Sequence, residues 1–462
     1  MNRLRNKRAD QVPARNNRTM GGVAAACMLA AAPFAFVMPA PALAKAKHVA
    51  AKTAPVHLGP SIADFYASRR DYPLWLSPAA GSAAQDLVQL LQSADLDGLD
   101  PNAYGLDAID RALGSAKKGD RKDIVRADRL LSQAFIAYVS DLRRVSGQGI
   151  IFVEPQLRPG VPASRPLLEE VARASSPSTY LKSFAWMSPL YADLRAALAG
   201  KKYDSDQQRA LIALNLERAR ILPAGKQRYL IVNAAEQRLF AYDDRKLVDQ
   251  MRVVVGKPKN PTPLMVALVR FAALNPYWYV PPDLAGERIA PNVLKQGLPY
   301  LSQLGYEVMS DWTEDASIVD PETVDWKAVA AGKKEIYIRQ LPGPHNSMGR
   351  MKFMFPNEAG IYLHDNPERE LFSEASRLYS GGCVRLEDAP RLGQWLFGRE
   401  LRWEGAAAEQ PVPLDRPVPV YITYLTAMPD GDGKVAFFDD VYGRDKARLA
   451  TLVLGSGPVA AR

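Results

Sequence analysis

The chain has 462 residues, of which 47% are hydrophobic and 24% charged, with a net charge of +9 and two cysteines. It is too long for one ordinary hydrophobic core, so we expect two or more domains. No basic cluster interleaved with aromatic residues occurs in it, which argues against nucleic acid as a partner.

The first 44 residues have the composition of an export signal. Six basic side chains and one acid precede a small, apolar run at Gly21–Val37, and Ala42-Leu43-Ala44 then offers a cleavage site. The run is short for a membrane span and prolines interrupt it, so we predict a cleaved signal peptide over residues 1–44. The alternatives are an uncleaved anchor and a lipoprotein modified at Cys27. The lipoprotein would have almost no apolar stretch before its cysteine.

Removal of residues 1–44 would change the charge and the cysteine count. The net charge would fall by 5, from +9 to about +4, a mild excess that suits an anionic wall or membrane surface. Cys27 would be lost, and Cys383 would be the one cysteine left. Oxidising compartments favour paired cysteines or none, so a single thiol suggests catalysis.

Residues 45–60 are rich in Ala, Lys and Pro and indicate a linker, and residues 61–222 then read as a helical domain. Apolar residues at helical spacing predict one amphipathic helix near residue 90 and a second over Ala127–Val145. The proline-rich stretch Phe152–Pro166 is interpreted as a loop inside this domain. The stripe of the first helix consists of Leu87, Leu90, Leu91 and Ala94.

Residues 223–462 read as a mainly β domain, so the fold class is α+β with a sandwich-like second domain. Short aliphatic and aromatic runs separated by turn residues predict strands. Residues 278–340 contain several prolines and three tryptophans, and a stretch of this length indicates an inserted lid. The predicted strands are Tyr229–Val232, Arg238–Tyr242, Val248–Val255, Glu335–Arg339, Gly360–His364, Val418–Tyr424 and Lys434–Phe438.

The segment Ser380-Gly381-Gly382-Cys383-Val384-Arg385 has the residue types of a nucleophile loop. Two glycines let the backbone turn tightly, and the amides of Gly382 and Cys383 could then face a developing oxyanion. A thiol attacks as thiolate and therefore needs a base. His364 ends a predicted strand nineteen residues before the cysteine and is the expected partner. The other histidines are His48 and His57, in or near the linker, and His345, in a turn-like loop.

Each of these residues also has a structural interpretation. Cys383 could be a small buried apolar residue, and His364 could be a hydrogen-bonded core histidine. The coincidence of a lone thiol, a Gly-Gly turn and a histidine at a strand end favours a catalytic dyad. One cysteine and scattered histidines have no metal-ligand spacing, so no metal and no cofactor are expected.

The run Gly360-Ile361-Tyr362-Leu363-His364-Asp365, followed by Ser380-x-Gly382-Cys383-Val384-Arg385, resembles the signature of the YkuD-type L,D-transpeptidases. The match covers roughly residues 215–445, and 61–144 more weakly. Further segments resemble the large Gram-negative branch of that family: Asn215-Leu216-Glu217-Arg218, Val253-Val254-Val255-Gly256-Lys257, Asn275-Pro276-x-Trp278-x-Val280-Pro281-Pro282, Pro342-Gly343-Pro344, Lys352-Phe353-Met354-Phe355-Pro356-Asn357 and Val441-Tyr442-Gly443-Arg444-Asp445.

The resemblance implies a periplasmic enzyme that cross-links peptidoglycan stem peptides and is acylated by carbapenem-type inhibitors. Cys383 would attack the bond between diaminopimelate and D-Ala of a donor stem, release D-Ala and pass the acyl group to an acceptor amine, with His364 as base and then acid. The motif also implies supporting roles. Gly382, Ser380, Tyr362 and Arg385 would form or support the oxyanion hole, with Arg385 either anchoring the loop or holding a substrate carboxylate, and Trp278, Asp365 and Gly381 would contact substrate.

Two departures from the family pattern bear on this expectation. Gly381 stands where relatives often carry His or Arg, at a variable position. The chain also passes from Leu194–Ala199 to Asn215 without the peptidoglycan-binding helical module that commonly lies there.

Several alternatives stay open. The acyl group could go to water, as in a carboxypeptidase or endopeptidase, or the protein could bind the wall without catalysis. The acceptor could give 3–3 or 1–3 cross-links or be a lipoprotein, with 3–3 favoured. Other wall-synthesis proteins are further candidate partners.

Overall fold

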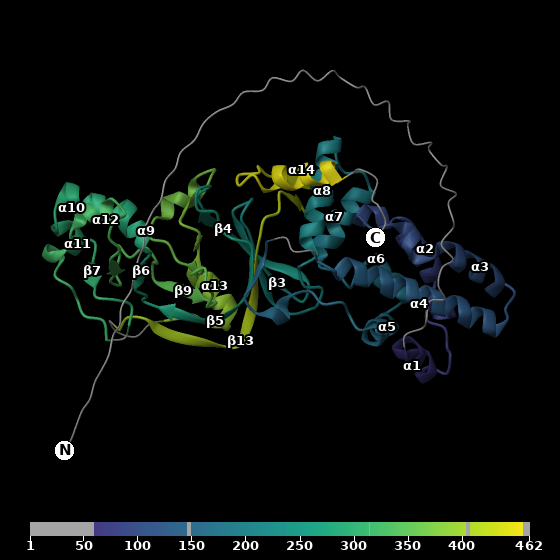
Figure 1. The fold of residues 1–462 in the computed structure, drawn as a ribbon. Helices are drawn as coiled ribbons and strands as arrows, with labels where there is room; N and C mark the ends of the chain where they lie inside the picture. The colour runs from purple at the N-terminus through teal and green to yellow at the C-terminus, as the bar shows by residue number, and fades with distance from the viewer. Residues whose placement is uncertain (1–59, 146–148, 314, 403–406, 456–462) are drawn as a thin grey trace, which may run out of the picture. The chain divides into compact units, whose positions relative to one another are not determined.

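A computed structural model describes residues 60–145, 149–313, 315–402 and 407–455 (Figure 1). The predicted signal peptide, with Cys27, and the linker up to residue 59 lie outside these residues, as do His48 and His57. No helix within the described ranges is both long enough and apolar enough to cross a bilayer.

Eight α-helices form the first part of the described chain. Both predicted amphipathic helices are present: Leu87, Leu90 and Leu91 of α2 are buried, and α4 covers most of the range predicted for the second. The helices share one apolar core, which Tyr229 of the first β-hairpin also enters. Their bounds are α1 Pro60–Ser68, α2 Ala83–Gln92, α3 Leu106–Ala116, α4 Arg121–Arg143, α5 Ser164–Arg173, α6 Pro177–Lys182, α7 Pro189–Ala199 and α8 Asp206–Ala219.

Local capping explains where several helices begin. The Asp120 carboxylate accepts from the Lys122 amide at 2.8 Å at the start of α4. Ser188 and Ser205 cap α7 and α8 in the same way. A side-chain acceptor at this position satisfies an amide that has no partner inside the helix. Only residues 200–205 join α7 to α8, so no further domain lies between them.

Two carboxylates are buried among these helices with full sets of donors. Asp128 accepts from the amides of residues 74, 75 and 76 at 2.7–2.8 Å and from the Tyr66 hydroxyl at 2.6 Å. Asp97 accepts from Tyr138 and Tyr191 and pairs with Arg195 at 2.8 Å. A buried charge costs least when every lone pair is used, so these contacts hold the helices in register.

Fifteen strands lie within the described residues, and most of them form one ten-stranded sheet (Figure 1). Its order is β1-β5-β13-β2-β3-β4-β12-β10-β9, with β11 paired to β4 as the tenth strand, and β9 also pairs with β5. The strands are β1 Ile151–Phe152, β2 Tyr229–Asn233, β3 Arg238–Asp243, β4 Lys246–Gly256, β5 Met265–Leu274, β6 Trp278–Val280, β7 Tyr306–Met309, β8 Tyr337–Gln340, β9 Met351–Met354, β10 Leu363–His364, β11 Leu378–Ser380, β12 Val384–Leu386, β13 Gln410–Thr423, β14 Ala427–Pro429 and β15 Val435–Phe437.

The pairing of β9 with β5 closes the sheet into a barrel-like arrangement, which replaces the sandwich-like pair of layers predicted from the sequence. The long strand β5 makes this closure possible, because β13 borders it along one edge while β9 and β1 share the other. The apolar side chains of these strands then fill one enclosed core.

β13 shows why part of the sheet was missed from sequence. Its first half contains Pro411 and Pro413, and Pro417 and Pro419 follow; prolines normally argue against a strand. Only β5 pairs with that half, with a register shift between Pro413 and Val418, whereas β2 pairs only with the last four residues. The prolines therefore lie before the residues that pair with β2. On that edge of β13 no neighbouring strand requires a backbone N–H, so their missing amide hydrogen costs no hydrogen bond there.

Residues 278–340 form a small subdomain with its own core, which we call the inserted subdomain. Strands β6, β8 and β7 make a three-stranded sheet covered by α9 Pro282–Leu284, α10 Ala290–Gln296, α11 Pro299–Gln303 and α12 Trp326–Ala330. Trp278 and Trp326 are buried in that core. The segment predicted as a lid is therefore a folded unit, with a five-residue π-helical turn at Ala285–Ile289.

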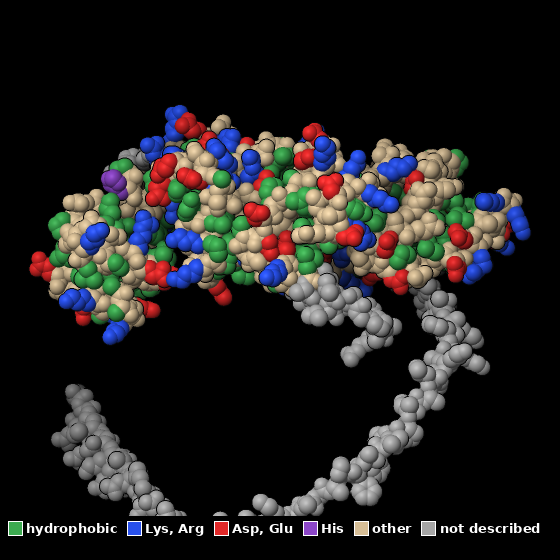
Figure 2. Space-filling view, turned by 90° about the horizontal axis from the view of Figure 1, so that it is seen from above, with side chains coloured by type: hydrophobic (Ala, Val, Ile, Leu, Met, Phe, Trp, Pro, Cys, Tyr) green, Lys and Arg blue, Asp and Glu red, His purple; other side chains and the backbone are tan. Residues whose placement is uncertain are grey.

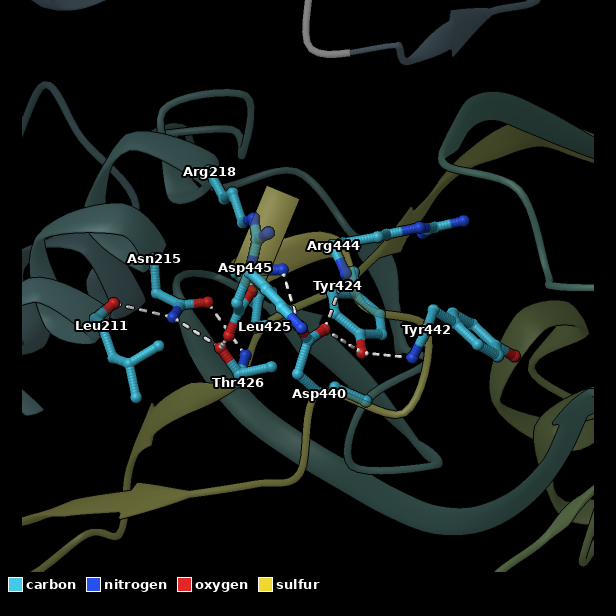
Figure 3. A network of polar contacts seen from close by, with 12 residues as sticks. Leu211, Asn215, Arg218, Tyr424, Leu425, Thr426, Asp440, Tyr442, Arg444 and Asp445 are labelled. Atoms are coloured by element: carbon cyan, nitrogen blue, oxygen red, sulfur yellow. Dashed lines mark hydrogen bonds and ion pairs between the residues drawn. The ribbon is translucent and has the colours of Figure 1, made fainter. Parts of the chain in front are cut away.

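The C-terminal segment is tied to α8 by buried polar contacts (Figure 3). The Asn215 side chain exchanges hydrogen bonds with the amide and hydroxyl of Thr426, and Asp445 of α14 Arg444–Gly455 accepts from Thr426 and pairs with Arg218. Tyr424 donates to Asp440 and accepts from the amide of Tyr442. These hydrogen bonds and the ion pair join the segments of Asn215 and Asp445, which are far apart in sequence.

Candidate active site

Strand register places the predicted dyad on one face of the sheet. β10 runs parallel to β12, with Leu363 opposite Val384 and His364 opposite Arg385, so Tyr362 comes opposite Cys383. Side chains alternate along a strand, and Leu363 and Val384 point into the buried core of the sheet. His364 and Cys383 therefore share the other face as diagonal neighbours, within reach of long side chains.

Cys383 is half-buried beside Tyr362. Its Sγ lies 3.5 Å from the carbonyl oxygen of Gly360, and it is hydrogen-bonded to the Tyr362 side chain. Burial raises the pKa of the Cys383 thiol to about 11, although the bonds to Tyr362 and the charge of Arg385 act in the opposite direction. At neutral pH Cys383 is therefore a protonated thiol.

His364 is buried, with one nitrogen fixed. Its Nδ1 lies 2.6 Å from the carbonyl oxygen of Asp365, so the neutral ring donates from Nδ1 and leaves Nε2 as a free acceptor. Burial, together with the charges of Arg385 and Lys352, lowers the pKa of His364 to about 3, although the hydrogen bond to the Asp365 carbonyl acts in the opposite direction. Both cations are direct cross-strand neighbours of His364, Arg385 on β12 and Lys352 on β9.

The resting pair is therefore a neutral thiol and a neutral imidazole. Such an arrangement can pass the thiol proton to Nε2 as the sulfur attacks, which is general base catalysis. It does not hold a preformed thiolate, because burial and the two flanking cations disfavour an imidazolium.

The loop before the nucleophile is held by Ser380. Its hydroxyl donates to the Cys383 carbonyl at 2.6 Å and accepts from the Gly382 amide at 3.1 Å. Gly382 has φ +128, and a side chain there would also press on Ile361, so this position requires glycine. Because the Gly382 amide is bonded to Ser380, the Cys383 amide and the Tyr362 hydroxyl are the remaining candidates for an oxyanion hole.

Two known domain families match parts of this chain. Residues 227–419 match the L,D-transpeptidase catalytic domain of the YkuD family, and residues 60–198 match a scaffold domain. The chain carries a YkuD-family L,D-transpeptidase catalytic domain behind an N-terminal scaffold domain.

Known proteins extend the comparison. The chain is 26% identical over 403 residues to a Haemophilus influenzae protein named "Putative L,D-transpeptidase", covering 84% of this chain and 78% of that one. A solved Ldtfm–avibactam carbamoyl enzyme matches at 16% identity and TM-score 0.22, over 44% of this chain and 51% of its own. An L,D-transpeptidase from Mycobacterium smegmatis matches at 14% identity and TM-score 0.20, over 42% of this chain and 58% of its own. The chain thus spans little more than half of those solved chains.

Thr262 supports the nucleophile loop of the YkuD domain and was missed from sequence. It is fully buried, and its hydroxyl donates to the Gly382 carbonyl at 2.8 Å and accepts from the Gly256 amide at 2.9 Å. Tyr442 donates to the Gly256 carbonyl at 2.7 Å and Arg444 to the Thr262 carbonyl at 3.0 Å. The ring of Tyr442 lies beside the network of Figure 3. No spacing in the sequence connects these three segments.

Arg385 extends from the dyad to an ion pair. Its guanidinium contacts Glu368 at 2.7 Å and Asn366 at 3.3 Å, and its side chain is 14% exposed. It is therefore an anchor of the segment after β10, and its charge also acts on both members of the dyad. His345, which the sequence left unassigned, is exposed on the far side of Arg385.

The predicted substrate contacts have different surroundings. The Asp365 carboxylate accepts from the Arg350 amide and pairs with Arg369, so its oxygens already have partners. Trp278 is buried in the core of the inserted subdomain. Asp365 instead orients His364 through its carbonyl. At Gly381 a side chain would meet only Leu284 at an ordinary 3.6 Å, in agreement with a variable position. Within the described residues no cluster of His, Cys, Asp or Glu is placed to hold a metal.

Proposed function

We propose that the protein is a peptidoglycan L,D-transpeptidase with Cys383 as nucleophile and His364 as general base. The observation that carries the proposal is the register of β10 against β12, which sets a neutral imidazole with a free Nε2 on the same face as the thiol. The YkuD-family domain supports the same chemistry.

In the first half-reaction the sulfur of Cys383 attacks the carbonyl carbon of diaminopimelate in a donor tetrapeptide stem. The thiol proton passes to Nε2 of His364, and the Cys383 amide and Tyr362 hydroxyl stabilise the oxyanion. Cleavage of the C–N bond releases D-Ala, whose amine takes the proton from His364. The product is a thioester between the stem and the enzyme.

In the second half-reaction an acceptor amine attacks the thioester carbonyl. His364 removes a proton from the amine and returns one to the departing sulfur, which regenerates the thiol. We favour the amine of diaminopimelate in a neighbouring stem, which gives a 3–3 cross-link. The inserted subdomain would then act as the lid that keeps water from the thioester.

The setting and the inhibitors follow from the same proposal. A cleaved signal over residues 1–44 would place the enzyme in the periplasm, where its substrate lies. A carbapenem, whose strained lactam carbonyl is an acyl donor, would acylate Cys383.

Mass spectrometry of the products tests the proposal. The purified chain without residues 1–44 is incubated with a tetrapeptide muropeptide, and the expected product is a dimer one D-Ala lighter than two monomers. Fragmentation locates the new bond and names the acceptor amine. Tripeptide monomer without dimer, at every acceptor concentration, would identify a carboxypeptidase, and unchanged substrate would reject catalysis.

A further inference from the structure

A polar pocket of about 290 Å³ lies between the inserted subdomain and the segment that follows β10. Arg288 and His345 contribute to it from one side, and Asn366, Glu368, Glu370 and Arg385 from the other. Arg385, the strand neighbour of His364, lines it, whereas neither Cys383 nor His364 does. The mechanism above gives this pocket no role.

The charges around the pocket are incompletely paired. Arg385 is paired with Glu368. Arg288 and Glu370 are exposed, and for neither of them is an ion pair recorded among the described residues. Arg288 lies close enough to Arg385 for its charge to lower the pKa of that guanidinium. One wall therefore carries an uncompensated cation and another an available carboxylate.

The position of Arg288 is itself unusual. It belongs to the π-helical turn Ala285–Ile289. Such turns are rare in proteins as a whole, and those that occur are often found at functional sites. The neighbouring Glu287 is paired with Lys259 at 2.7 Å, and Ile289 is buried. Both neighbours of Arg288 in the turn are therefore engaged elsewhere, whereas Arg288 itself lines the pocket.

A cation and a carboxylate in one small pocket suit a ligand that carries both an anionic and a cationic group. An arginine binds a carboxylate through two parallel hydrogen bonds, and a glutamate accepts from an ammonium. The free amino-acid end of a diaminopimelate side chain has both groups on one carbon, three methylenes from the backbone. Arg385 lines the pocket and is the direct strand neighbour of His364, so a donor whose carbonyl lies at Cys383 could place that end here.

We propose that the pocket of Arg288, Glu370 and Arg385 binds the ammonium and carboxylate at the end of the donor's diaminopimelate side chain. This inference rests on the proposed function and assigns its donor specificity. A stem with lysine at the third position has the ammonium but no carboxylate, and is therefore a poorer donor.

Binding to the full chain with Cys383→Ala tests the pocket without turnover. Calorimetry compares a tetrapeptide stem with diaminopimelate, its analogue amidated at the side-chain carboxylate, and its lysine analogue. We expect the two analogues to bind roughly ten-fold more weakly, the effect of one lost charge-assisted contact. In Cys383→Ala with Arg288→Gln the three ligands should bind alike, because the partner of the carboxylate is gone.

Lys295→Gln, which removes an exposed cation from α10 of the same subdomain, is the matched control and should keep the ten-fold preference. A preference that survives Arg288→Gln, or one that is absent when Arg288 is present, would overturn the proposal. Single-turnover acylation of the chain with its native cysteine then separates donor from acceptor binding, because only the donor takes part in that step. A preference seen in binding and missing from acylation would contradict the donor assignment.

Failure of the pocket assignment and failure of the proposed function give different experimental results. A chain that forms dimers equally from diaminopimelate and lysine donors retains the proposed function and loses the pocket. A chain that forms no dimer, yet binds diaminopimelate stems through Arg288, retains the pocket and loses transpeptidation.

Discussion

The helical region and the catalytic sheet both bury ionisable side chains, but they surround them differently. Asp128, between the helices, accepts four hydrogen bonds from three amides and Tyr66. His364, in the sheet, has one fixed hydrogen bond, and cations flank it on both neighbouring strands. Burial raises the pKa of Asp128, and its hydrogen bonds act against that effect. At His364 the two cations instead add to the effect of burial, which lowers the pKa.

This difference in partners distinguishes a side chain that is buried for stability from one whose burial suits the proposed catalysis. A carboxylate with all its lone pairs used gains nothing from exchanging a proton, so it contributes to stability. An imidazole with a free nitrogen and a destabilised charged form accepts a proton only while a reaction supplies one. Burial alone does not distinguish the two cases, but the set of partners does.

The largest effect is expected from Cys383→Ala, which removes the nucleophile. Acylation by a donor peptide, followed by intact-protein mass spectrometry, should fall below detection, because the alanine has no group that can form a thioester. The midpoint of thermal unfolding should change little, since Cys383 is half-buried and only a sulfur atom is lost. An acyl adduct on this variant would disprove the assignment.

His364→Ala should slow acylation by roughly 10²–10⁴-fold at neutral pH, the usual contribution of a general base. The measurement is the single-turnover rate of thioester formation. His57→Ala serves as the control, because His57 belongs to the predicted linker and not to the dyad or the pocket of Arg288. An unchanged rate in His364→Ala would mean that another group takes the thiol proton.

Asp128→Ala should lower the free energy of unfolding by about 3 kcal/mol or more, because it leaves several buried donors unsatisfied. Urea denaturation followed by circular dichroism measures the change. Asp110→Ala, at an exposed position of α3, should leave the free energy nearly unchanged. Equal effects of the two substitutions would show that the Asp128 contacts do not support the helices.

The double variant Lys352→Met with Glu409→Gln removes one cation beside His364 together with its ion-pair partner. In the native chain the pKa of His364 is lowered to about 3, so the imidazole stays neutral above that pH. Loss of the Lys352 charge raises this pKa, and acylation at pH 4 should fall by roughly three-fold relative to pH 7. Rates measured across pH 3–8, with Lys334→Met as an exposed control, check the shift. Superimposable profiles would exclude Lys352 as a cause of the neutral imidazole.

The smallest effect is expected from Thr262→Val, which keeps the shape of the side chain and removes its hydroxyl. The Gly382 carbonyl then loses a donor and the nucleophile loop becomes less well fixed, so kcat for acylation should fall about three- to ten-fold with little change in KM. Thr313→Val, at an exposed turn, is the control. A change confined to KM would indicate a role in binding instead.

Local patterns were sufficient for part of this molecule. Leu87, Leu90 and Leu91 predicted α2, because the period of a helix appears as apolar residues three and four positions apart in the sequence. The hairpin of β2 and β3 followed from turn residues between two apolar runs. Cys383 and His364 were found because both residue types are scarce in the chain.

Other features depended on partners far away in sequence. The closure of the sheet rests on β5 with β9, and the strand role of β13 on where its prolines lie relative to a neighbour. The two cations beside His364 are visible only in the register of three strands. Asp365 was predicted as a substrate contact, yet its carboxylate is used by a loop that no spacing would connect to it.

β1 has a consequence for how the chain acquires its fold. Ile151 and Phe152, at the start of the stretch predicted to be a loop from Phe152 onward, run beside the start of β5, and Glu154 accepts from the Leu268 amide. This piece of sheet is made before β5 exists, so during synthesis it has no edge to join for more than a hundred residues. A chain that begins at residue 223 would lack it altogether and would leave that edge of β5 open to another molecule. The N-terminal half therefore supplies a protecting strand that the later half cannot make for itself.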